Sequence, residues 1–295
     1  MAGLTYLGEC VGVCESERMR VYGIDFTSRP RAGKPITCLH CVLEAGTLRA
    51  GVLSAWQDFA AFEEALRRPG PWIAGIDFPF GQARRFIENI GWPATWSGYV
   101  AHARALGRAG FRAQLDSYRE RRPPGDKEHR RATDCLARSL SPQKLYGTPV
   151  GLMFFEGAPR LLGAGVEVPG LQEGDPRRVV VEAYPGVLAR ALIGQRSYKQ
   201  DTKAKQTGNQ AAARRELVDK LNDGAAKPLY GLDVRAPMEL ADDPCGDQLD
   251  ALLCAIQAGW AWTKRNNGFG LPDDLDPLEG WIADATVAQR ALECR

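Results

Sequence analysis

The residues best suited to chemistry are two aspartates that end similar apolar segments. Gly23-Ile24-Asp25-Phe26 and Gly75-Ile76-Asp77-Phe78 each place a carboxylate near the end of a run with the length and β-branched content of a buried strand. Burying an ionised aspartate is costly unless a cation or a hydrogen-bond donor pairs with it. The repeated pattern therefore predicts one site to which both strands contribute, with Asp25 and Asp77 as its first two members.

Two more acids lie on a long apolar segment near the end of the chain. A helix is expected there, with Asp243 as its N-cap and its end near Trp262. Asp247 and Asp250 are three residues apart, so they share one face of this helix, which otherwise has almost no polar side. The helix dipole accounts for Asp247 in the first turn, but Asp250 is expected beyond its reach. Asp250 therefore requires a partner.

A fifth acid, Glu182, lies on a β-branched strand expected over 179–183. The resulting set of candidate catalytic residues is Asp25, Asp77, Glu182, Asp247 and Asp250. Clustered carboxylate oxygens favour Mg²⁺ or Mn²⁺ over zinc, and two such ions about 3.5–4 Å apart would stabilise the attacking and leaving oxygens of phosphodiester hydrolysis. None of the three histidines pairs visibly with a Ser or Cys nucleophile, which disfavours a hydrolase triad. The competing interpretation is that the acids form buried ion pairs with arginines.

A polar helical segment over 82–146 carries more Lys and Arg than Asp and Glu, with Trp and Tyr interleaved. Such a mixture suits a phosphate backbone with stacked bases, and a solvated helical face whose aromatic residues enter the core explains it equally well. A second basic stretch follows the strand that carries Glu182 and includes a loop over 198–208. The candidate substrate-binding residues from both stretches are Arg121, Arg122, His129, Arg130, Arg131 and Lys199.

The elements expected before the basic segment follow the order β-β-β-α-β. Three strands with tight connections predict an antiparallel meander, and a helix then leads to the strand that carries Asp77. The strands are expected over 21–26, 36–43, 48–53 and 72–80, with the helix over 55–68.

This order, with acids on the first and fourth strands and D-x-x-D on a late helix, resembles the ribonuclease H-like fold. The segment 247–252 is similar to the final acidic helix of RuvC-type resolvases. GIDF at 23–26, IDFPFG at 76–81, VEAYPG at 181–186, DQLDA at 247–251 and EGWI at 279–282 together resemble an uncharacterised family described as predicted RNase H-like nucleases, over about residues 20–285.

The resemblance implies an α/β fold with a five-stranded mixed sheet of order 3-2-1-4-5, flanked by helices, with the acids at one edge. It implies a single domain over 1–295 with a core at about 20–285, the helical basic insertion at about 82–146 and an appendage at 1–18. It further implies a metal-dependent nuclease acting on DNA or RNA.

Carried onto this chain, Asp25 would bridge two metal ions, Asp77 would complete one site, and Asp247 or Asp250 the other. RuvC-like enzymes commonly have Glu on the fourth strand, so the shorter Asp77 alters the expected spacing. Glu182 matches no standard ligand, and it could be a third-site ligand, a water-orienting base or an ion-pair partner. The basic segment 129–134 would lie above the acids and clamp a phosphate.

Net charge, apolar runs and cysteines bear on whether the chain is a basic nucleic-acid binder, a membrane protein or a secreted protein. The formal net charge is only +2 over 295 residues, so the chain as a whole is not a basic nucleic-acid binder. The absence of an 18-residue apolar run predicts no membrane helix, and no secretory signal is recognisable at the first residues. The eight cysteines are therefore expected to be reduced thiols in the cytoplasm. Cys38 and Cys41, with Cys10 and Cys14, could hold a structural zinc, although packing thiols are the stronger expectation.

Two other functions fit the same pattern. One is an ATP-dependent phosphotransferase of the actin and sugar-kinase type, whose first strand reads G-I-D-x-G-T. Phe26-Thr27-Ser28-Arg29 lacks the glycine that lets a phosphate approach the backbone there, which counts against it. The other is a nucleic-acid-binding module that has the fold but no catalysis. The presence of all the acids disfavours it.

Overall fold

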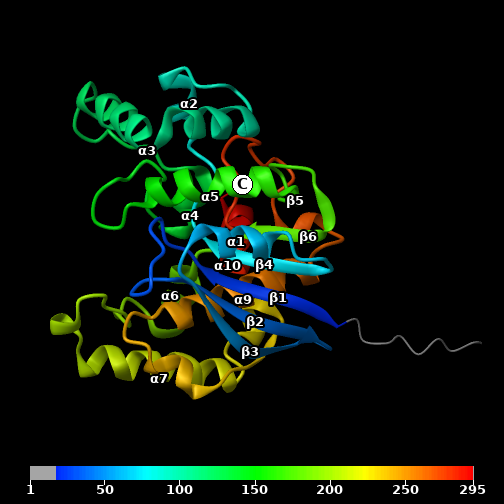
Figure 1. The fold of residues 1–295 in the computed structure, drawn as a ribbon. Coiled ribbons are helices and arrows are strands. Elements are labelled where there is room, and N and C mark those ends of the chain that lie inside the picture. Colours follow the sequence, from blue (N-terminus) through cyan, green and yellow to red (C-terminus); the bar gives the residue numbers. More distant parts are fainter. Residues whose placement is uncertain (1–17, 295) are drawn as a thin grey trace, which may run out of the picture.

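The computed structural model describes residues 18–294 and has a mixed seven-stranded sheet with helices on both faces (Figure 1). The strand order is β5-β6-β4-β1-β2-β3-β7. β1, β2 and β3 form the antiparallel meander, and β4 and β6 run parallel to β1. The strands are β1 Met19–Asp25, β2 Ile36–Glu44, β3 Thr47–Trp56, β4 Trp72–Asp77, β5 Val166–Glu167, β6 Asp175–Glu182 and β7 Asp233–Arg235.

The five strands expected from the sequence occupy the centre of this sheet in the expected order, with β6 as the fifth. Two further strands, β5 and β7, extend the sheet at its edges, so the five-strand count falls short by two. They are only 2 and 3 residues long, and a segment that short carries no readable alternation. β1 and β4 are neighbours, and Asp25 pairs in register with Asp77.

Two hydrophobic cores lie on opposite faces of the sheet. Helices α6, α7 and α9 cover one face, whereas α1, α3 and α5 cover the other. The helices are α1 Phe59–Leu66, α2 Arg84–Ile90, α3 Trp96–Glu120, α4 Ala132–Ala137, α5 Val150–Ala164, α6 Pro185–Ile193, α7 Gly208–Asn222, α8 Lys227–Tyr230, α9 Asp247–Thr263 and α10 Ala285–Glu293. No helix in residues 18–294 combines the length and apolarity needed to cross a bilayer.

The glycines of the two GIDF segments let α9 lie directly against the sheet. Gly23 and Gly75 are register partners on β1 and β4. A Cβ on Gly23 would lie 1.8 Å from the carbonyl oxygen of Ala251, and one on Gly75 would lie 2.4 Å from that of Cys254. Any side chain at either position would push α9 outward. The repeated motif thus sets the distance between the strands and the helix that carries Asp250.

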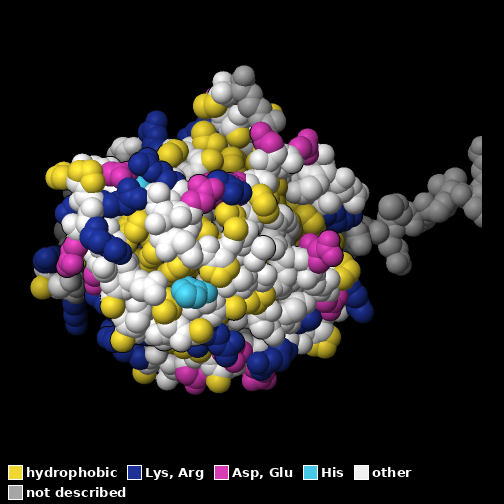
Figure 2. Space-filling view, turned by 90° about the horizontal axis from the view of Figure 1, so that it is seen from above, with side chains coloured by type: hydrophobic (Ala, Val, Ile, Leu, Met, Phe, Trp, Pro, Cys, Tyr) yellow, Lys and Arg dark blue, Asp and Glu magenta, His cyan; other side chains and the backbone are white. Residues whose placement is uncertain are grey.

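The helical insertion buries most of its aromatic residues, so they are not exposed for stacking on nucleic-acid bases. Trp92, Trp96, Tyr99, Phe111 and Tyr118 all lie in the core. Figure 2 views the molecule from the side on which α2 and α3 lie, and shows Lys and Arg side chains in separate groups, with Asp, Glu and hydrophobic side chains between them. This agrees with a solvated helical face whose aromatic residues enter the core.

Candidate metal centre

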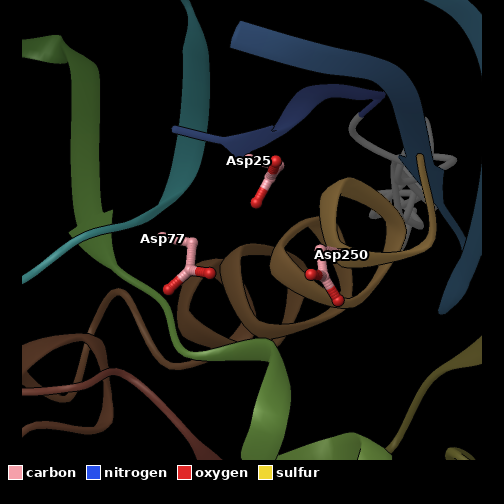
Figure 3. A group of neighbouring side chains, drawn as sticks. All are labelled: Asp25, Asp77 and Asp250. Carbon is pink, nitrogen blue, oxygen red and sulfur yellow. The ribbon is translucent and has the colours of Figure 1, made fainter. Parts of the chain in front are cut away.

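Three carboxylates from separate parts of the chain meet at one edge of the sheet. Asp25 ends β1, Asp77 ends the neighbouring β4, and Asp250 lies in the first turn of α9. One oxygen from each carboxylate lies within 4.8 Å of an oxygen of the other two. Figure 3 shows the three side chains directed toward a common space between the strands and the helix. Three oxygen donors so arranged are the kind of ligand set that a hard divalent cation prefers.

The start of α9 differs from the sequence expectation in a way that affects the site. The expected N-cap, Asp243, lies in a preceding turn, where its carboxylate accepts hydrogen bonds from two backbone N–H groups that follow it. Gly246, with φ of 77°, is the actual N-cap, and the helix begins at Asp247. Asp250 is therefore within the first turn, where the helix dipole favours a carboxylate. The expectation that it lies beyond the dipole was wrong.

Asp25 and Asp77 have no bonded counter-charge in the part of the chain that the structure describes. Asp25 is only 8% exposed, and within residues 18–294 no group donates a hydrogen bond to either carboxylate. Burial, and next the nearby carboxylate of Asp250, raises the pKa of Asp25 well above its ordinary value. Burial likewise raises the pKa of Asp77 to about 7. Buried carboxylates in this state are stabilised by a bound cation.

Asp250 and Asp247, unlike Asp25 and Asp77, each have a lysine partner. Both oxygens of Asp250 accept hydrogen bonds, one from the Tyr198 hydroxyl and one from the Lys199 ammonium group. Asp247 is paired with Lys34 at 2.7 Å and is outside the group of three. Four aspartates were expected to bind metal. Three of them meet in the structure, whereas the fourth, Asp247, pairs with Lys34 instead.

Comparison with known proteins identifies a family. The family model for a protein of unknown function, DUF429, matches residues 23–275, which include all three aspartates. The chain belongs to the DUF429 family. No curated protein and no solved structure matches the chain.

In this DUF429 protein Glu182 forms a buried ion pair. Its carboxylate accepts hydrogen bonds from the Arg131 guanidinium at 2.6 and 2.8 Å, and from the backbone N–H of Phe80 at 2.9 Å. Arg131 also donates to Asp134. Arg131, Asp134 and Glu182 are each at most 3% exposed. Of the three roles left open for Glu182, the structure shows the ion pair.

Most side chains of the basic segment expected above the acids are held by internal contacts, although Arg131 lines a hollow that also includes Asp77 and Lys199. The guanidinium of Arg131 lies within the ion pair just described and is not free to clamp a phosphate. His129 is buried, and its Nε2 lies 2.6 Å from the hydroxyl of Tyr118. Arg122 lies over the ring of Tyr118 and pairs with Asp126 at 2.5 Å. These side chains hold the insertion together.

Arg121 and Arg130 are exposed, and neither lines the cavity that contains Asp25. Sequence reasoning placed them by charge and proximity along the chain. Of the six expected substrate-binding residues, only Lys199 borders this cavity.

A cavity of about 400 Å³ opens beside the three acids. Asp25, Asp77 and Asp247 contribute to its lining, together with Lys34 and Lys199. An adjoining hollow of about 230 Å³ shares Asp77 and Lys199 with it. Lys34 was missed by sequence reasoning, although it lies in the turn after β1 and must therefore lie at the same sheet edge as Asp25. The cavity thus combines anionic metal ligands with two ammonium groups.

The C-x-x-C pair does not form a metal site. Cys38 belongs to the core on the α1, α3 and α5 face, whereas Cys41 belongs to the core on the opposite face. Burial raises the pKa of both thiols, that of Cys41 to about 12, so they are protonated at neutral pH. Cys10 and Cys14 lie outside the described residues. The packing role expected for Cys38 and Cys41 agrees with these positions.

Glu182→Gln in the DUF429 protein tests whether this carboxylate acts in stability or in metal binding. Removing its charge leaves Arg131 buried with only Asp134 as an ionic partner, and breaking such a pair costs about 3–5 kcal/mol. We expect a loss of that size in urea unfolding, with an unchanged number of Mn²⁺ ions bound. A stable variant that binds fewer ions would instead make Glu182 a ligand.

Proposed function

We propose that the protein is a metal-dependent nuclease that hydrolyses phosphodiester bonds of DNA or RNA, with Mg²⁺ or Mn²⁺ held by Asp25, Asp77 and Asp250. The observation that carries the proposal is the buried Asp25 carboxylate, which has no hydrogen-bonded partner among the described residues and is directed at the other two acids. The ribonuclease H-like assignment is part of this proposal. The central strand order and the placement of acids on β1, β4 and a late buried helix support it.

The residues present fit a hard cation. All three donors are carboxylates, and Asp25 and Asp77 also line the cavity through which an ion could reach them. When bound, such an ion polarises a phosphoryl oxygen and makes a coordinated water more acidic. In the hydrolysis, a water oxygen forms a bond to phosphorus while the bond from phosphorus to a sugar oxygen breaks, and that oxygen takes up a proton.

The surroundings of the acids favour a polyanionic substrate. Lys34 and Lys199 line the same cavity as Asp25, so a phosphate entering it meets positive charge beside the metal ligands. The six described cysteines are all free, which is compatible with the reducing cytoplasm that the sequence suggested. Nucleic acid in the cytoplasm is therefore the partner that we propose.

The test is a cleavage panel with purified protein. Labelled single-stranded and double-stranded DNA, RNA, a hybrid and a four-way junction are incubated with Mg²⁺, with Mn²⁺ or with EDTA. We expect cleavage of at least one substrate with metal and none with EDTA. Binding without cleavage, weakening steeply with salt, would replace the proposal with a binding module. Stabilisation by ATP without any cleavage would favour the phosphotransferase.

Metal binding is expected to depend on pH through Asp77. Its pKa is raised from 3.8 to about 7, so without added metal the folded state holds a proton that the unfolded chain has lost. Between these pH values the free energy of unfolding therefore falls as pH rises. A cation requires the ionised carboxylate, so Mn²⁺ should raise the melting temperature more at pH 8 than at pH 6. Equal Mn²⁺-induced shifts at the two pH values would contradict this.

A further inference from the structure

We infer that the site takes one divalent cation and that the ammonium group of Lys199 stands in the place of a second, where it contacts the substrate phosphate. This inference rests on the proposed function and deepens it, because the sequence pattern alone pointed to two metal ions. It makes Lys199 a catalytic residue and not a surface charge.

The carboxylates around the cavity provide the ligands for one ion. Asp25, Asp77 and Asp250 form a group of three whose oxygens lie within 4.8 Å of one another, which is a ligand set for a single cation. Asp247, which a second ion would need as a ligand, lies outside this group and is bonded to Lys34 at 2.7 Å.

Lys199 is placed where it can act on both the acids and a ligand. Its ammonium group is bonded to Asp250, one of the three proposed ligands, and its side chain is 46% exposed. Lys199 lines both the cavity beside Asp25 and the adjoining hollow, so it lies where the two spaces meet at Asp77. Lys34 differs, because it is held between Asp201 at 3.0 Å and Asp247 at 2.7 Å.

Hydrogen bonds to backbone carbonyl groups fix the loop on both sides of Lys199. The buried guanidinium of Arg214 donates to the carbonyl oxygens of Tyr198 and Ala241, at 2.9 and 2.7 Å. The N–H of Gln200 donates to the carbonyl oxygen of Pro244 at 3.0 Å. These bonds join the loop to the segment before α9 on both sides of Lys199, so the position of the ammonium group is set before any substrate binds.

The N-cap residue of α9, Gly246, lies against the side chain of Lys199. A Cβ on Gly246 would lie 2.7 Å from Cβ of Lys199, and the φ of 77° at Gly246 is one that glycine adopts readily. The Lys199 side chain therefore passes directly over the N-terminus of α9 to reach Asp250. The loop expected over 198–208 is therefore anchored at Lys199 by these contacts.

The experiment measures ion number, ion affinity and cleavage for the full chain. Mn²⁺ is titrated by electron paramagnetic resonance and calorimetry into wild type, Lys199→Met, Lys199→Gln and Lys199→Arg. The matched control is Lys264→Met, an exposed lysine just beyond the other end of α9. Melting temperatures identify any variant that fails to fold, and the two neutral variants guard against such a failure in one of them.

We expect one Mn²⁺ per wild-type chain. Both neutral variants should bind Mn²⁺ at least as tightly as wild type, because they remove an ammonium group that competes for Asp250. Their cleavage at saturating Mn²⁺ should nevertheless fall by about 10²–10³-fold, as for removal of one charge-stabilising donor. Lys199→Arg should recover part of the lost rate, and Lys264→Met should match wild type throughout.

Three results would overturn the inference. Two Mn²⁺ ions per wild-type chain would show that a metal ion, and not Lys199, fills the second position. Wild-type cleavage by a neutral variant would show that the ammonium group is not needed. A rate loss explained entirely by weaker Mn²⁺ binding would make Lys199 a positioning residue for Asp250. If wild type binds one ion but cuts no substrate, the nuclease proposal fails while the ion count still stands.

Discussion

Asp25→Asn is expected to abolish metal-dependent cleavage, with a loss of about 10³-fold or more. Asp25 is buried and receives no hydrogen bond from any group within residues 18–294, so its charge depends on a bound cation. An ion at such a site contributes several kcal/mol to transition-state stabilisation, and about 4 kcal/mol corresponds to 10³ in rate. The amide has nearly the shape of the carboxylate, so the fold is expected to remain intact.

Thermal unfolding separates loss of metal from loss of fold in this variant. Wild type should gain about 2.7 kcal/mol of stability at a Mn²⁺ concentration 100-fold above its Kd, and Asp25→Asn should gain almost none. Without metal the variant should be at least as stable as wild type, because it removes a poorly compensated buried charge. The matched control is Asp116→Asn, which removes the same charge from a half-exposed position on α3. Undiminished cutting by Asp25→Asn would indicate a contaminant and end the assignment.

Gly23→Ala is expected to damage the fold and the site together. The added methyl group would lie 1.8 Å from a backbone oxygen of α9, and a carbonyl in a buried helix cannot rotate away as a side chain could. The helix must shift as a unit, and overpacking of this kind costs about 3 kcal/mol or more. A shift of α9 also moves Asp250 away from Asp25 and Asp77, so Mn²⁺ binding should weaken at the same time.

Urea unfolding and Mn²⁺ titration check this prediction. The control is Gly33→Ala in the turn before β2, where an added Cβ would meet no atom within 4 Å. It should unfold within about 0.5 kcal/mol of wild type and bind Mn²⁺ normally. If Gly23→Ala also behaved like wild type, α9 would have room to move on the sheet, and the close approach of Gly23 and Gly75 would not be what positions Asp250.

Three of the predicted site residues could be found from the sequence because local patterns place them. Asp25 and Asp77 end apolar runs whose strands are parallel neighbours, and Asp250 interrupts an otherwise apolar helix. Each pattern is local, and each acid is conspicuous because its segment is apolar. The central strands were also found from local features, namely strand length and turn residues, whereas their order in the sheet followed from the resemblance to the ribonuclease H-like fold.

The parts that could not be predicted depend on contacts between distant segments. Arg131 and Glu182 are 51 positions apart, and nothing local distinguishes an arginine that pairs with a buried acid from one that contacts solvent. The pairing of Lys34 with Asp247, 213 positions away, is equally invisible in the sequence. The start of α9 was misplaced because Asp243 and Pro244 form a good helix start, and Gly246 supplies a later one.

The chain order of the three acids has a consequence for the protein during its synthesis. β1 and β4 are made early, whereas α9 is made only after more than two hundred further residues separate it from β1. A nascent chain that ends before α9 can pair the two strands, yet it lacks Asp250 and the helix that closes the cavity. The ribosome would therefore carry a chain without an assembled cation site until residues 247–263 emerge.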